Sequence, residues 1–127
     1  MRRAGGAMLV GLLLAAAVPT AETAELVMFE ERGCPWCARF DLEIGPIYAR
    51  TEEARRAPLR RVDLDAGIPA ELAHLAPVRF TPTFVLLEDG REVGRIQGYP
   101  GEMHFWGLLG MLLERLPERA AGTAAAG

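Results

Sequence analysis

The spacing of hydrophobic residues in this chain predicts four strands and several helices. The first strand is expected at residues 25–31, because their continuous apolar run at 26–29 is typical of a strand buried on both faces. The next apolar residues share one helical stripe and are Phe40, Ile44, Ile47 and Tyr48. Gly45-Pro46 predicts a kink in this helix, because proline removes a backbone hydrogen bond and clashes with the preceding turn. Helix is expected to resume over 47–57, where Pro58 ends it.

The second half of the chain predicts three more strands. Residues 59–65 alternate apolar and charged side chains, so a second strand is expected there, joined to the first by a parallel crossover. Residues 66–77 leave room for a short helix at 70–75. Strands at 83–88 and 91–97 are expected to pair antiparallel, because the intervening Asp89-Gly90 is a strong hairpin signal.

The last predicted element is a helix over residues 102–116, which Pro117 ends. Its apolar residues recur on a single face, and they are Phe105, Leu108, Leu109, Leu112, Leu113 and Leu116. The predicted order is β-α-β-α-β-β-α, an α/β fold with a central mixed four-stranded sheet.

Residues 1–24 are expected to be a secretory signal peptide. Arg2 and Arg3 precede an apolar stretch at 7–18, which is shorter than the ~20 residues that a bilayer span needs. Cleavage is possible after Ala17, Ala21 or Ala24, and an uncleaved membrane anchor is the alternative. The mature chain then comprises one domain at 25–117 and a disordered, Ala/Gly-rich tail at 118–127.

Composition narrows the possible functions. The 127 residues are half hydrophobic, which suits one small globular domain. The net charge of −3 gives no reason to expect nucleic-acid binding. All 14 basic residues are arginine, so the chain has no lysine with which to do chemistry.

The candidate chemistry lies in Gly33-Cys34-Pro35-Trp36-Cys37, which contains both cysteines. A C-x-x-C pair between a strand and a helix is typical of a redox dithiol. Unpaired N–H groups at a helix N-terminus lower a thiol pKa from ~8.5 to roughly 3.5–7.5, so Cys34 is predicted to attack and Cys37 to resolve. An exported protein has disulfides to exchange with.

Two other interpretations of the cysteines carry less weight. A static structural disulfide would close a ring of four residues, too short to stabilise the fold much. A metal site would need further ligands, and His74 and His104 lie at no zinc-finger spacing from the cysteines. We therefore expect no metal and no cofactor other than the redox-active disulfide Cys34–Cys37.

This sequence resembles the thioredoxin superfamily in its minimal, glutaredoxin-sized form. The resemblance spans residues 25–116 and rests on C-P-W-C at 34–37 and on Thr81-Pro82-Thr83. It implies that Pro82 is a cis-proline beside the dithiol and that Thr81 presents its backbone to the substrate. The alternative for Pro82 is an ordinary trans proline at the start of a strand. Pro35 and Trp36 are expected to contact the substrate, although Trp36 packing on the protein's own surface is equally compatible.

Four further runs, at 58–64, 80–86, 90–95 and 98–102, resemble the SoxS-type periplasmic thioredoxins of bacterial sulfur-oxidation clusters. That resemblance implies a periplasmic reductase that keeps the thiosulfate-oxidising system active. It would reduce the cysteine of the sulfur-carrier protein and receive electrons from a membrane thiol transporter of the CcdA type. The alternatives are an oxidase or isomerase of exported proteins, and a non-enzymatic redox sensor or adaptor.

The chain also departs from thioredoxin proper. Its dipeptide is Pro-Trp rather than Gly-Pro, and Met28 stands where thioredoxins bury an acid that assists proton transfer. A methionine accepts no proton, so Cys37 would need water or another group, with Glu30 and Glu31 as candidates. His74 and His104 are expected on exposed or half-buried helix faces without a catalytic role. Tyr99 is open to two interpretations, a substrate surface or packing.

Overall fold

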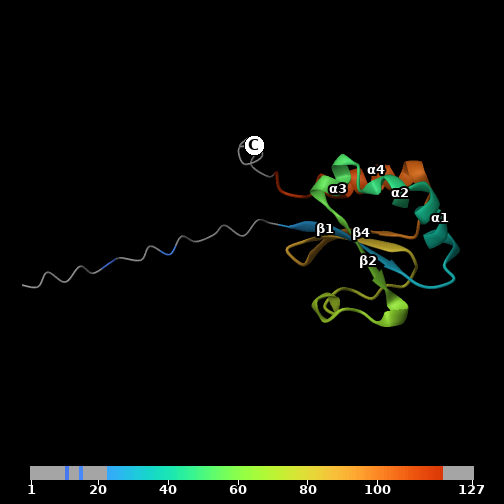
Figure 1. The fold of residues 1–127 in the computed structure, drawn as a ribbon, viewed down its shortest axis with the longest axis horizontal. Coiled ribbons are helices and arrows are strands. Elements are labelled where there is room, and N and C mark those ends of the chain that lie inside the picture. The colour runs from blue at the N-terminus through green and yellow to red at the C-terminus, as the bar shows by residue number, and fades with distance from the viewer. Residues whose placement is uncertain (1–10, 12–14, 16–22, 119–127) are drawn as a thin grey trace, which may run out of the picture.

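The computed structural model describes residues 11, 15 and 23–118 (Figure 1). Most of the predicted signal peptide and of the predicted tail lies outside the described residues. In the part of the chain that the structure describes, no helix is long and apolar enough to cross a membrane.

A four-stranded mixed sheet forms the centre of the fold, as predicted. Its strands are β1 (Ala24–Glu30), β2 (Leu59–Asp63), β3 (Thr83–Glu88) and β4 (Arg91–Gln97), in the order β2-β1-β3-β4. β1 runs parallel to β2 and antiparallel to β3, which pairs antiparallel with β4. β1 begins at Ala24, one residue earlier than predicted. β2 ends earlier than predicted, because the Asp63 carboxylate accepts the N–H of Asp65 and caps a 3₁₀ turn.

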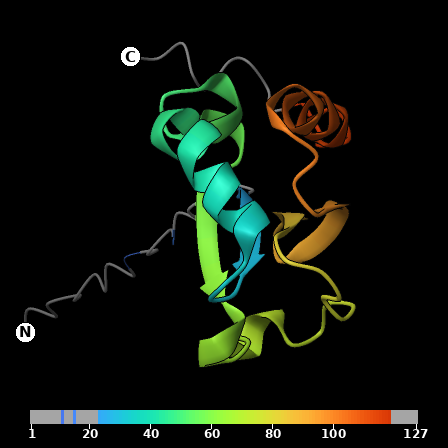
Figure 2. The same cartoon turned by 90° about the vertical axis from the view of Figure 1, so that its right-hand side faces the viewer.

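The two faces of the sheet are covered by different parts of the chain (Figures 1 and 2). All four α-helices lie over one face, and Leu26 and Met28 of β1 pack against them. Val27 and Phe29 point to the other face, which is covered by the segment between β2 and β3. All four side chains are buried, which confirms that β1 is buried on both sides.

The helical segment after the cysteines is divided rather than kinked. It comprises α1 (Pro35–Glu43), α2 (Gly45–Tyr48) and α3 (Glu52–Arg56). The second break arises because the Thr51 hydroxyl donates to the carbonyl of Tyr48 and accepts the N–H of Ala54 at 3.2 Å, which starts a new helix. Of the four residues on the predicted stripe, Phe40, Ile44 and Tyr48 are buried, whereas Ile47 is 41% exposed.

The helices predicted at 70–75 and 102–116 begin at the predicted residues but end earlier than predicted. The segment between β2 and β3 forms only two 3₁₀ turns, η1 (Leu64–Ala66) and η2 (Ala70–Leu72). The final helix, α4 (Glu102–Leu113), ends three residues before the predicted position. Its buried side chains are Phe105, Leu109, Leu112 and Leu113, whereas Leu108 is 41% exposed and Leu116 lies in the following turn.

Charged pairs cover the outer strands, β2 and β4. Arg60 of β2 pairs with Glu25 at 3.4 Å and with Glu71. Arg95 of β4 pairs with Glu92, and its guanidinium also donates to the carbonyls of Ala76 and Pro77 at 3.3 Å each.

Candidate active site

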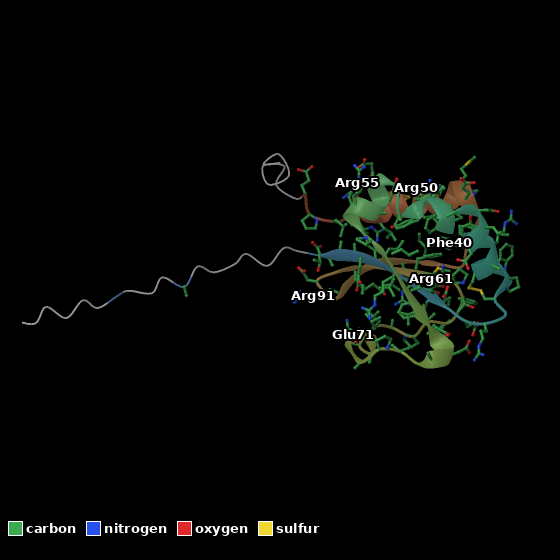
Figure 3. All side chains as sticks on the ribbon, in the orientation of Figure 1. Phe40, Arg50, Arg55, Arg61, Glu71 and Arg91 are labelled. Carbon is green, nitrogen blue, oxygen red and sulfur yellow. A yellow bond between two sulfur atoms is a disulfide. The ribbon has the colours of Figure 1, made fainter. Side chains whose placement is uncertain are left out.

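Cys34 and Cys37 lie where the loop after β1 enters α1. Gly33 makes this turn with a φ of +74°, in the left-handed region that favours glycine. Cys34 is the N-cap of α1, and its Sγ accepts the backbone N–H of Cys37 at 3.1 Å. The two Sγ atoms form a disulfide with a Cα–Cα separation of 5.3 Å, visible as the yellow bond in Figure 3.

The surroundings of the two sulfurs differ. Cys34 is half-buried, whereas Cys37 is 6% exposed and belongs to the apolar cluster that includes Met28 and Phe40. An incoming molecule therefore reaches Cys34 first. The backbone N–H at the Cys34 sulfur stabilises a thiolate there when the disulfide is reduced. This geometry agrees with the predicted order of attack.

The segment that leads into β3 contains Thr81 and Pro82, and we call residues 80–82 the proline loop. The Thr81–Pro82 peptide bond is cis, the geometry that the resemblance implied. Pro82 is buried, and its carbonyl accepts the N–H of Gly98 at 2.7 Å, which joins this loop to the end of β4. The Thr81 hydroxyl donates to the Glu31 carboxylate at 2.6 Å, so the proline loop is also tied to the segment that precedes the cysteines.

A shallow groove with aromatic walls lies beside the proline loop. We call it the aromatic groove; it is lined by Trp36, Phe80, Thr81, Gln97, Gly98, Tyr99 and Pro100. Trp36 is 53% exposed and Phe80 is 60% exposed, so two large apolar surfaces face solvent next to Thr81. Exposed aromatic side chains of this kind are typical of contact surfaces. Sequence reasoning did not single out Phe80, although an apolar residue directly before Thr-Pro and outside the strand is a usable signal.

A second pocket opens over the sulfurs on the side of β2, and we call it the dithiol pocket. Cys34, Pro35 and Cys37 line it together with charged residues of β1, α1 and β2. Arg61 of β2, labelled in Figure 3, pairs with Glu30 and lies 2.7 Å from Asp41. Sequence reasoning missed Arg61 and Asp41, which approach each other only after β2 has paired with β1.

Both candidates for a proton acceptor near Cys37 line the dithiol pocket. They differ in their partners, because Glu30 is held by Arg61 and Glu31 by the hydroxyl of Thr81. Met28 is fully buried in the apolar cluster that contains Cys37. The charged residues near Cys37 therefore lie on the side of the dithiol pocket, whereas the Met28 side is apolar.

Both histidines lie away from the cysteines. His74 is exposed in the turn after η2 rather than on a helix, with its ring Nε2 2.8 Å from the carbonyl oxygen of Gly90. His104 is exposed on α4. Neither lines the dithiol pocket or the aromatic groove. Among the described residues, no group of three or more His, Cys, Asp or Glu side chains could hold a metal ion.

Tyr99 both packs in the core and lines the aromatic groove, the two positions that the sequence analysis left open. Its ring is 4% exposed and packs edge-on against Phe40 at 5.7 Å between centroids, while it also lines the aromatic groove. Its hydroxyl donates to Glu43 at 2.5 Å, and Glu43 pairs with Arg39 at 2.7 Å. The hydrogen bond from Tyr99, and then Arg39, lower the pKa of Glu43, whereas burial and Glu43 raise the pKa of Tyr99.

Replacing Tyr99 with phenylalanine is therefore expected to make the free energy of unfolding depend less on pH in the acid range. A carboxyl whose pKa is lower in the folded state stabilises the fold above its ordinary value of 4.5, and that contribution is lost as pH falls through the lowered value. Tyr99→Phe removes the largest cause of the shift. Urea unfolding should show a larger difference from the unmodified protein at neutral pH than well below pH 4.5. An equal difference in stability between the variant and the unmodified protein at the two pH values would contradict this account.

Comparison with known proteins agrees with this geometry. A family model described as a thioredoxin-like domain matches residues 14–112. The crystal structure of the periplasmic thioredoxin SoxS from Paracoccus pantotrophus, in its reduced form, has 47% sequence identity and a TM-score of 0.67, and the match covers 72% of this chain and 97% of that one. A thioredoxin from Thermus thermophilus has 25% identity and a TM-score of 0.54, covering 71% of this chain and 73% of its own. A search of curated proteins found no match.

Proposed function

Because this chain belongs to the thioredoxin-like family, we propose that it is a periplasmic disulfide reductase that keeps the cysteine of a partner protein reduced. The fold and the Cys34–Cys37 disulfide make it a thiol-disulfide oxidoreductase. The observation that carries the proposal is the position of the two sulfurs. One is accessible at a helix N-terminus, and the other is buried one turn further along the helix.

The proposed reaction is a transfer of two electrons by disulfide exchange. The Cys34 thiolate attacks one sulfur of the partner disulfide, forming a bond to it while the other partner sulfur leaves as a thiolate. Cys37 gives up its proton and attacks the Cys34 sulfur. The Cys34–Cys37 disulfide forms and the second partner sulfur leaves, so the partner gains the two electrons that the dithiol loses. Re-reduction by an external dithiol completes the cycle.

The partner we propose is the sulfur-carrier protein of thiosulfate oxidation. The support is the 47% identity with a periplasmic thioredoxin named SoxS, whose whole length this chain nearly spans. Pro35, Trp36, Thr81 and Pro82 are the proposed contacts. Pro35 lines the dithiol pocket beside Cys34, Trp36 and Thr81 line the aromatic groove, and Pro82 forms the cis peptide bond with Thr81. A membrane thiol transporter of the CcdA type is the proposed electron donor.

Measuring the reduction potential tests the proposed direction of electron flow. Equilibration with glutathione or dithiothreitol buffers, followed by the fluorescence of the exposed Trp36 and of Trp106, gives the fraction of disulfide at each potential. A reductase is expected near the thioredoxin value of about −270 mV, and an oxidase near the DsbA value of about −120 mV. A value at the oxidising end would overturn the reductase proposal in favour of an oxidase. Absence of turnover with any disulfide substrate would instead favour a redox sensor or adaptor.

A further inference from the structure

The sulfurs lie between two surfaces of different chemistry. The aromatic groove, with Trp36 and Phe80, lies toward β3 and β4. The dithiol pocket, which contains Arg61, lies toward β2 at the other edge of the sheet. A polypeptide segment that presents a disulfide to Cys34 is therefore flanked by both surfaces, and each favours a different kind of side chain.

Most charges of the dithiol pocket are already paired within the protein. Arg61 pairs with both Glu30 and Asp41. Arg32 lies 3.6 Å from the carboxylate of Asp65, which also accepts its backbone N–H at 2.8 Å. Within residues 23–118, two carboxylates of this pocket have no salt-bridge partner, Asp63 and Glu31. Asp63 accepts the backbone N–H of Asp65, whereas Glu31 is the one that is bonded to the proline loop.

The Glu31 carboxylate is nevertheless held in one place. It is exposed, it lines the dithiol pocket with Cys34, and it accepts the hydroxyl of Thr81 at 2.6 Å. Thr81 directly precedes the cis-proline, and its backbone is the proposed contact for the substrate. The hydrogen bond therefore places a negative charge beside the path of a bound segment, and no arginine within residues 23–118 forms a salt bridge with it.

We propose that Glu31 selects disulfide partners that carry a basic side chain next to the reactive cysteine. This inference rests on the proposed function and adds a specificity-determining residue to it. An exposed pair of opposite charges strengthens the encounter modestly and in a salt-dependent way. We expect a basic neighbour to raise the rate of reduction by about two- to fivefold over a neutral one.

The test uses the reduced protein and three disulfide-linked peptides that differ in the residue next to cysteine: arginine, glutamine or glutamate. Rate constants of reduction are measured by stopped-flow fluorescence at low and high salt. The unmodified protein should reduce the arginine peptide fastest and the glutamate peptide slowest. Glu31→Gln keeps an oxygen that can accept the Thr81 hydroxyl and should make the rates nearly equal. Glu31→Arg should reverse the order, and high salt should reduce all preferences.

Comparing peptides within one variant removes any effect of the substitution on the reactivity of Cys34 itself. Glu114→Gln is the matched control, because it removes one exposed carboxylate just after α4, away from both pockets, and should keep the original order. If Glu31→Arg reduces the glutamine peptide and keeps the original order, the role of Glu31 is rejected and the reductase activity stands. If the unmodified protein reduces no peptide, the proposed function fails, and this inference fails with it.

Discussion

Cys37→Ser is expected to accumulate a covalent complex with the partner, whereas Cys34→Ser should form none. The accessible Cys34 attacks first, and without the Cys37 sulfur the mixed disulfide cannot resolve. Both variants should lose essentially all multiple-turnover reductase activity. Non-reducing electrophoresis after mixing with the sulfur-carrier protein, followed by mass spectrometry, measures the trapped species.

The double variant with serine at both positions is the control for adventitious disulfides. Equal trapping by the two single variants would contradict the assigned order of attack. Rapid alkylation adds a second measure, since Cys34 should react with iodoacetamide at neutral pH faster than a free cysteine. A rate equal to that of free cysteine would remove the electrostatic basis of the proposed mechanism.

Phe40→Ala is expected to lower the free energy of unfolding by about 3–5 kcal/mol, a large part of the stability of a small domain. The Phe40 side chain is fully buried, with ring centroids 4.9 Å from Phe84 and 5.4 Å from Phe105. It therefore joins α1 to both β3 and α4. Chemical denaturation followed by circular dichroism measures the loss, and the midpoint of thermal unfolding should fall by more than about 10 °C.

The matched control for Phe40 lies on the same helix. Leu42→Ala removes a side chain that is 81% exposed and should change stability by no more than about 0.5 kcal/mol. A similar loss in both variants would show that the effect comes from the helix itself rather than from the aromatic cluster. Because Cys37 packs in the same cluster as Phe40, we also expect Phe40→Ala to slow resolution of the mixed disulfide.

The sequence predicted the strands well because local signals determine them. The bounds of β3 and β4 match to the residue, since Asp89-Gly90 places the turn and the apolar residues on either side set the pairing. The helices were less predictable. Gly45-Pro46 indicated one interruption, but the second break depends on the Thr51 hydroxyl competing with the helix for backbone groups.

Within the site, the motif located Cys34 and Cys37, and the resemblance located the proline loop. The contacts between distant segments could not be read from the sequence. Thr81 and Glu31 are 50 residues apart, and their hydrogen bond depends on how the proline loop meets the end of β1. The Arg61 pairs likewise depend on the register of β2 against β1. Such contacts follow from tertiary structure rather than from local pattern.

The arginines on the two outer strands have a consequence for behaviour at high concentration. An outer strand presents unpaired backbone groups that can recruit a strand from another molecule and begin aggregation. Here Arg60 and Arg61 stand on β2, and Arg91 and Arg95 stand on β4. Arg60, Arg61 and Arg95 are each paired with carboxylates, so a strand that docked on either edge would have to displace or bury charged side chains, and polymerisation through the sheet is disfavoured. The molecule can therefore expose two large aromatic rings beside its cysteines while its sheet edges resist self-association.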